Sequence, residues 1–202
     1  MGDQMTRGWR LRYLLGAAFL AGGVVLTLAP ASAADQIFPG QDVRLPDNDL
    51  IEAARSGDVD GVRNALMRGI PPDDGGIEYI PAITVATKYN HANVVKFLLE
   101  NGANPNRRAR DGSTALAAAT QAGSASLVKI LLDGGADPDL LADHGDTPIF
   151  IAVRARRTTI VQMLVDHGAA LDDTDLTGRT VLDLAEERHY DDIVQLLRNA
   201  GA

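Results

Sequence analysis

The chain has 202 residues, of which 46% are hydrophobic and 23% charged, and its formal net charge is −8. It contains no cysteine, so disulfide bonds and thiol chemistry are excluded. The acidic balance argues against nucleic acid as a partner, because its phosphates require a positive surface, and against electrostatic attachment to anionic lipid.

The first 33 residues have the order of a secretory signal peptide. Three arginines precede an uncharged apolar run at 14–28, and the small residues at 31–33 form a cleavage motif. We expect cleavage between Ala33 and Ala34 and a periplasmic or secreted product, so that contact with the membrane is transient. The alternative is an uncleaved anchor, although this run is shorter than the about 20 apolar residues that a membrane span needs.

Residues 34–46 contain proline and glycine without a period and are expected to form a flexible linker. From there on, glycine motifs recur along the chain with a period of 33 residues. It separates the glycines of Gly-Ala pairs at positions 102, 135, 168 and 201, and the glycines of Gly-x-Thr motifs at 112, 145 and 178. A fixed period of this length predicts stacked helix-turn-helix units, none of which buries its apolar face alone.

Five units are predicted, at about 47–75, 76–108, 109–141, 142–174 and 175–202. The first helix of each unit carries an aliphatic residue followed three positions later by alanine, as in Leu116 and Ala119, so that neighbouring helices can approach closely. The second helix carries an aliphatic stripe with helical spacing, which includes Leu131 in the third unit.

Helix ends are marked by two residue types. Threonines stand just before three first helices and are expected to cap them: Thr114, Thr147 and Thr180. Glycines that follow three second helices are expected to have positive φ: Gly102, Gly135 and Gly168. The turn between the two helices has Gly57 and Gly123, but elsewhere Asn90, Arg156 and His189, of which Arg and His should cost about 1 kcal/mol there.

These motifs resemble those of the ankyrin repeat family, whose units run from Gly-x-Thr-Pro-Leu to a Leu-Leu stripe and Gly-Ala-Asp-x-Asn. Residues 112–116, 145–149 and 178–182 match the first motif, and residues 98–106 and 131–137 match the second. The resemblance covers 47–202 and implies an all-α solenoid of five units with short β-turn fingers. The second unit has Tyr79-Ile80-Pro81 in place of Gly-x-Thr, so its finger is expected to be reshaped.

The sequence carries no catalytic signature, and we predict neither an enzyme nor a cofactor. It lacks a Gly-x-Ser-x-Gly motif, a P-loop and a His-Glu-x-x-His motif. The four histidines are spread over three units. A run of aspartates misses the spacing of an EF-hand, so no metal site is predicted: Asp137, Asp139, Asp143 and Asp146.

The resemblance instead implies that a monomer binds another protein through a concave face of finger tips and first helices. The candidate residues are Ile77, Glu78, Tyr79, Ile80, Lys88, Tyr89, Arg110, Asp111, Ser113, Gln121, Asp143, His144, Asp146, Arg154, Leu176, Thr177 and Arg179. The tyrosines are notable because only six aromatic residues follow residue 33. Alternatively, Tyr79 and Ile80 only pack a distorted finger.

Similar exported bacterial proteins imply a role in protecting the cell against, or supporting, an extracytoplasmic enzyme. Two alternatives stay open, an accessory protein that binds a small ligand or metal and a structural spacer. Arg107, Arg108 and Arg110 form a basic finger, which suits an acidic partner patch or simply serves solubility.

Overall fold

The computed structural model describes residues 49–142 and 145–202. The predicted signal peptide and linker lie outside the described residues, as do the candidate site residues Asp143 and His144. No helix in the described ranges combines the length and apolar character needed to cross a membrane.

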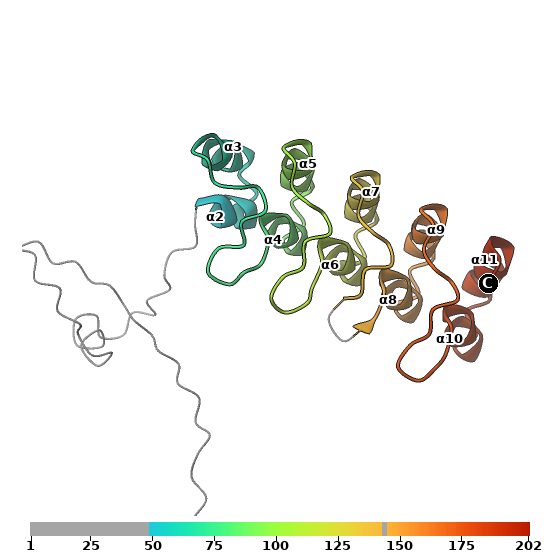
Figure 1. The fold of residues 1–202 in the computed structure, drawn as a ribbon. Coiled ribbons are helices and arrows are strands. Elements are labelled where there is room, and N and C mark those ends of the chain that lie inside the picture. The colour runs from blue at the N-terminus through green and yellow to red at the C-terminus, as the bar shows by residue number, and fades with distance from the viewer. Residues whose placement is uncertain (1–48, 143–144) are drawn as a thin grey trace, which may run out of the picture. The chain divides into compact units, whose positions relative to one another are not determined.

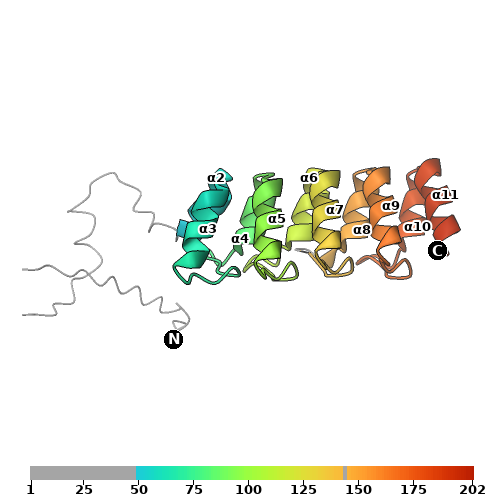
Figure 2. The same ribbon diagram turned by 90° about the horizontal axis from the view of Figure 1, so that it is seen from above.

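The described residues form ten α-helices in five helix-turn-helix pairs, which confirms the predicted all-α solenoid. The pairs are α2 (Asp49–Ser56) with α3 (Val59–Met67), α4 (Ala82–Lys88) with α5 (Ala92–Glu100), α6 (Ala115–Ala122) with α7 (Ala125–Asp133), α8 (Pro148–Arg154) with α9 (Thr158–Asp166), and α10 (Val181–Glu187) with α11 (Asp191–Ala200). Even-numbered helices form one row, called the inner row here, and odd-numbered helices form the outer row (Figures 1 and 2).

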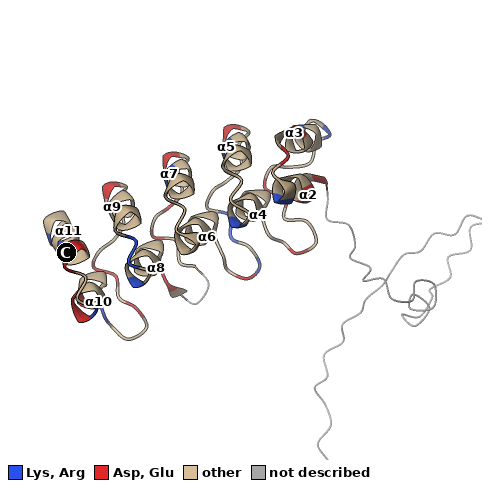
Figure 3. Ribbon diagram, turned by 180° about the vertical axis from the view of Figure 1, so that it is seen from behind, with Lys and Arg blue, Asp and Glu red and all other residues tan. Residues whose placement is uncertain are grey.

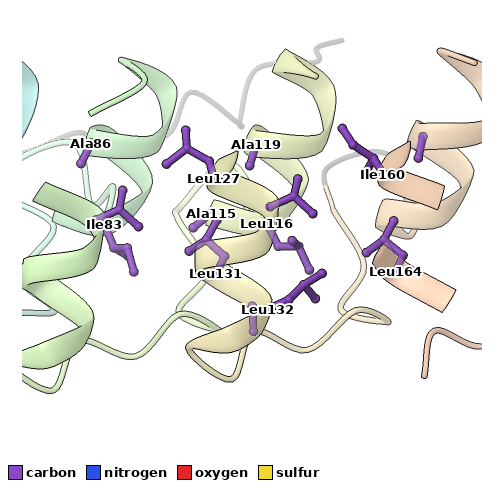
Figure 4. Packing of buried hydrophobic residues seen from close by; sticks show 14 of the residues in the cluster. Ile83, Ala86, Ala115, Leu116, Ala119, Leu127, Leu131, Leu132, Ile160 and Leu164 are labelled. Atoms are coloured by element: carbon purple, nitrogen blue, oxygen red, sulfur yellow. The ribbon is translucent and has the colours of Figure 1, made fainter. Parts of the chain in front are cut away.

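The core runs along the whole stack because each helix packs against its counterparts in the neighbouring units. The inner helix α6 contacts α4 and α8, and the outer helix α7 contacts α5 and α9. Ala119 is fully buried between inner helices, and Leu116 and Leu131 fill the space between the rows (Figure 4). A helix sandwiched in this way needs a wide apolar stripe, which the sequence supplies.

The helix ends follow the sequence prediction with one exception. Thr114 and Thr180 each accept a hydrogen bond from a backbone N–H of the first turn, and Asp183 completes a capping box with Thr180. Thr147 also occupies the N-cap position, but its buried hydroxyl has no partner. There Pro148 begins the helix with its fixed φ, and only the Thr147 backbone carbonyl accepts from the helix, at Ile151 N.

The turns between paired helices contain the predicted left-handed residues. Gly57 and Gly123 have positive φ, as do Asn90, Arg156 and His189. The side chain of the next unit that packs on each turn explains whether the left-handed residue is glycine. A Cβ on Gly123 would lie 2.7 Å from the Arg157 guanidinium of the next unit, and one on Gly57 would lie 2.6 Å from the ring of the next unit's His91.

At two other turns a longer side chain contacts the next unit instead. Ser124 donates to the Asn90 side chain at 3.1 Å, and the Arg156 guanidinium lies 5.1 Å from the centre of the Tyr190 ring. Glycine is therefore kept where the next unit needs close approach, and it is replaced where a side chain forms the contact.

A ladder of side-chain hydrogen bonds joins successive units at the turns after the outer helices. Asp73 Oδ1 accepts from Asn104 N at 2.7 Å, Asn106 Oδ1 from Asp137 N at 2.8 Å, and Asp139 Oδ1 from Ala170 N at 2.8 Å. Donors and acceptors both recur every 33 residues, so the polar turns that the sequence predicted also connect the units.

Candidate functional site

Four loops, the fingers, hang in a row below the inner helices (Figure 1). We number them by unit: finger 2 (71–81), finger 3 (104–114), finger 4 (137–147) and finger 5 (170–180). All described candidate residues lie in these fingers or toward the ends of α4, α6 and α8. The fingers and these helix ends together form the finger face.

Exposed apolar side chains gather on the finger face. Among the described residues, six large hydrophobic side chains are exposed, and five of them lie here: Ile77, Tyr79, Tyr89, Leu141 and Leu176. Leu176 is 90% exposed and Tyr79 64%. Leu141 escaped the sequence analysis, although an apolar residue at a finger position where other units have glycine, arginine or threonine was a usable signal.

Ile80 is not one of these exposed residues. It is half-buried and packs against the hydrophobic core. This packing agrees with the alternative that Ile80 packs the finger, and its role in binding stays a prediction. Its neighbour Tyr79 points into solvent instead, so the two residues of this finger differ.

Finger 2 differs from the other fingers in its backbone. Tyr79 has φ 55°, whereas glycine occupies the equivalent left-handed position in fingers 3, 4 and 5. Ile80 N donates to Gly75 O at 3.0 Å, and a Cβ on Gly75 would lie 2.8 Å from the Tyr79 carbonyl carbon. The finger thus folds back tightly and holds an exposed tyrosine in a strained conformation, which costs about 1–3 kcal/mol.

Finger 3 is the basic finger, and it faces finger 2 across a groove. Arg107, Arg108 and Arg110 are exposed and line the groove, an open cavity of about 680 Å³, together with Tyr79. Arg110 N donates to Tyr79 O at 3.1 Å, and its guanidinium lies 6.0 Å from the centre of the Tyr79 ring. Blue segments of the ribbon mark the basic residues of this loop in Figure 3.

Three other candidates near finger 3 bind one another. Asp111 Oδ1 accepts from the backbone N–H and the hydroxyl of Ser113, at 2.9 and 2.6 Å, and Lys88 lies 3.4 Å from Asp111 Oδ2. The Ser113 hydroxyl is the main cause that lowers the pKa of Asp111. These side chains shape the finger, and only part of each remains available to a partner.

Finger 5 and the end of α8 carry arginines too, but acidic residues pair with them. The side chain of Asp175 is nearly buried and accepts from the Thr177 hydroxyl at 2.6 Å and from Arg179 Nη2 at 2.9 Å. Arg179 also reaches Glu187 at 2.5 Å. Arg154 pairs with Asp146 and lies 3.9 Å from Asp175.

The hydrogen bond from Thr177 is the main cause that holds the pKa of Asp175 far below its usual range, and Arg179 lowers it further. Asp175 therefore stays ionised at neutral pH and neutralises the cations around it. Arg154 and Arg179 belong to this network. They are therefore weaker binding candidates than the unpaired arginines of finger 3.

Potential metal ligands are scattered over the described residues. In those ranges no three His, Asp or Glu side chains converge as a metal would require. The histidines make structural contacts instead: His91 Nε2 lies 3.0 Å from Arg55 O, and His167 Nδ1 lies 2.8 Å from Met163 O. Asp137 and Asp139 accept backbone hydrogen bonds in turns.

A family model described as ankyrin repeats in three copies matches residues 50–142 and 123–202. The chain belongs to the ankyrin repeat family. Ankyrin repeats are generally protein–protein interaction modules and are typically not enzymes. No curated protein matches the chain significantly. The resemblance to ankyrin repeats stated from the sequence is thus confirmed. In this ankyrin repeat protein, the finger face is the candidate surface for a partner.

Proposed function

We propose that this ankyrin repeat chain is a non-enzymatic binding module whose finger face holds another protein. The observation that carries the proposal is the concentration of exposed apolar side chains on that face, from Ile77 to Leu176. Fully burying such a side chain contributes about 1.5–3 kcal/mol, so their exposure is unfavourable in the unbound protein. Tyrosines such as Tyr79 and Tyr89 are also enriched among the residues that dominate binding energies.

The proposed setting is the periplasm or the medium outside the cell, because residues 1–33 have the order of a signal peptide. The proposed partner is an extracytoplasmic enzyme that the chain supports or neutralises as a monomer. N-terminal sequencing of the exported protein tests the location, and a start at Ala34 is the expected result. A start at Met1 in the membrane fraction would favour an anchor instead.

The alternatives from the sequence gain less support. A metal accessory needs converging ligands, and no three His, Asp or Glu side chains of the described residues come together in this way. A spacer has no use for exposed leucine and tyrosine on one face, where they favour aggregation.

Chemical cross-linking in the native extracytoplasmic fraction, followed by mass spectrometry, identifies the partner, and its affinity is then measured with purified variants. Leu176→Ala and Tyr89→Ala are each expected to weaken binding by about 1–2 kcal/mol. Lys96→Ala and Lys129→Ala are the controls, because both lysines are exposed on outer helices and pair there with Glu100 and Asp133 of their own helix. Equal losses from both sets would contradict the finger face as the site.

A further inference from the structure

Some basic residues of this acidic chain form ion pairs with carboxylates, and others do not. Within 49–142 and 145–202, five arginines form no ion pair with a described residue: Arg107, Arg108, Arg110, Arg157 and Arg188. Three of the five lie within four residues of finger 3. Unpaired cations are therefore concentrated at one place, although carboxylates outnumber basic side chains in the chain as a whole.

The groove beside these arginines is organised before any partner arrives. Tyr79 is fixed in the left-handed conformation, and its carbonyl holds the backbone of Arg110 at 3.1 Å. The only carboxylate among the groove residues is Asp73, whose Oδ1 accepts from Asn104 N. Three arginines and a tyrosine thus line the same open space, and the one carboxylate among the lining residues is engaged by a backbone N–H.

Guanidinium groups bind carboxylates through two parallel N–H···O bonds, so an arginine cluster beside an aromatic ring suits an acidic segment with an apolar residue. The chain as a whole is acidic and repels such a segment, so a cluster of unpaired arginines is the favourable place for it. Nucleic acid fits less well, because its regular phosphates need a longer positive track than one finger offers.

We propose that the groove between fingers 2 and 3 binds an Asp/Glu-rich segment of the partner protein, with Arg107, Arg108 and Arg110 on its carboxylates and Tyr79 against its apolar residue. This inference rests on the proposed function and specifies the chemistry of the partner at that face. It also separates the basic finger from the apolar finger 5, where Leu176 is the exposed anchor.

The test uses the purified full chain and a short fluorescent peptide of aspartates and glutamates around one leucine, with binding followed by anisotropy. The same peptide with asparagine and glutamine is the neutral comparison. We expect the acidic peptide to bind about ten-fold or more tightly than the neutral one at low salt, and to lose this advantage at about 0.5 M salt.

The triple variant Arg107→Ala/Arg108→Ala/Arg110→Ala is expected to weaken the acidic peptide about ten-fold or more. Arg157→Ala/Arg188→Ala is the matched control, since it removes unpaired arginines elsewhere, and it should change affinity less than about two-fold. Circular dichroism verifies that both variants stay folded. The single charge reversal Arg108→Glu, at an exposed position, gives the same answer should the triple variant be damaged.

Equal binding of acidic and neutral peptides would overturn the inference, and so would equal losses from the two sets of arginines. Tighter binding of a single-stranded oligonucleotide through the same arginines would overturn it too, because the site would then recognise any polyanion. The two proposals fail separately. If the identified partner still depends on Leu176 while the acidic peptide fails to bind, only this inference falls, whereas a partner indifferent to every finger variant removes the proposed function.

Discussion

Fingers 3 and 5 occupy equivalent places in the repeat and both carry arginine. The arginine of finger 5 is paired with carboxylates, whereas the arginines of finger 3 are not. At the base of finger 5, the nearly buried Asp175 gathers Thr177, Arg179 and Arg154 around one carboxylate. The equivalent residue of finger 3 is the buried Ala109, and the arginines beside it stay exposed without an acidic partner. The residue at the base of the finger, Asp175 or Ala109, thus determines whether the neighbouring arginines form ion pairs or remain exposed to solvent.

The comparison teaches that a basic residue in a repeat is a binding candidate only after its possible internal partners are known. Arg154 and Arg110 look alike in the sequence, and both were candidates. The structure assigns Arg154 to a network that joins fingers 4 and 5. It leaves Arg110 against a tyrosine ring at the edge of a groove.

The largest expected effect comes from breaking the scaffold that holds both fingers. Leu131 is fully buried on α7, in the unit that carries finger 3, and α7 packs against α9 of the next unit. Leu131→Ala should lower the free energy of unfolding by about 2–5 kcal/mol, because a cavity adds to the lost burial. Urea denaturation measures this change, and Lys129→Ala on the exposed side of α7 should stay within about 0.5 kcal/mol. An unchanged midpoint for Leu131→Ala would contradict the packing.

A smaller effect should follow from removing only the carboxylate of finger 5. Asp175→Asn is expected to destabilise the chain at neutral pH, because Arg154 and Arg179 lose the charge that they surround. The folded-state pKa of Asp175 is lowered, so its contribution is complete above the unfolded value of about 3.9 and is lost as the pH falls further. Unfolding midpoints of wild type and variant should therefore differ at pH 7 and converge below about pH 4.

Asp111→Asn in finger 3 is the control for this change. Its pKa is lowered as well, mainly by the Ser113 hydroxyl, but the side chain is exposed. It should destabilise less than Asp175→Asn. The reverse order would remove the distinction between the two fingers.

The distinction is sharpest in a matched pair of arginine variants. Arg110→Ala should leave the unfolding free energy within about 0.5 kcal/mol of wild type while weakening the acidic peptide. Arg179→Ala should lower the unfolding midpoint, since Asp175 and Glu187 both lose a partner, and should not affect the peptide. Urea denaturation and peptide anisotropy on the same preparations give both readings, and parallel behaviour of the two variants would refute the comparison.

The smallest effect is expected where finger 2 is made to resemble the others. Tyr79→Gly places glycine at the left-handed position that Gly178 holds in finger 5. Relief of strain should raise the unfolding free energy by up to about 1 kcal/mol, partly offset by the greater freedom of the unfolded chain. Acidic-peptide binding should weaken, because the ring is gone. Tyr79→Phe keeps the ring and should change neither quantity, whereas a loss of stability in the glycine variant would argue against strain at this residue.

The fold could be read from the sequence because every unit buries the same positions. The 33-residue step fixed the alanines of the inner row, the outer stripe and the glycines that end the outer helices, and the structure agrees. The exception at Thr147 arises because a following proline begins the helix, so that the threonine supplies only its backbone carbonyl. Repetition thus predicts backbone well, and side-chain bonding less well.

The candidate site was harder, because its contacts join different units. Arg154 on α8 and Asp175 in finger 5 are 21 residues apart in the sequence yet 3.9 Å apart in space, and no local pattern links them. Ile80 and Tyr79 are sequence neighbours with opposite environments, which only the fold of finger 2 decides. The membership of the finger face was predictable by alignment of the repeats, but the availability of each charge was not.

The side-chain ladder between units has a mechanical consequence. Each rung is one or two hydrogen bonds between an Asp or Asn side chain and the next unit. Since each unit touches only its neighbours, tension applied at the two ends passes through every junction in turn. Units should then peel off one by one, each releasing 33 residues, or roughly 110–120 Å of extended chain. The units should therefore separate at similar forces. A partner that bridges two fingers would raise the force needed to separate the units that carry them.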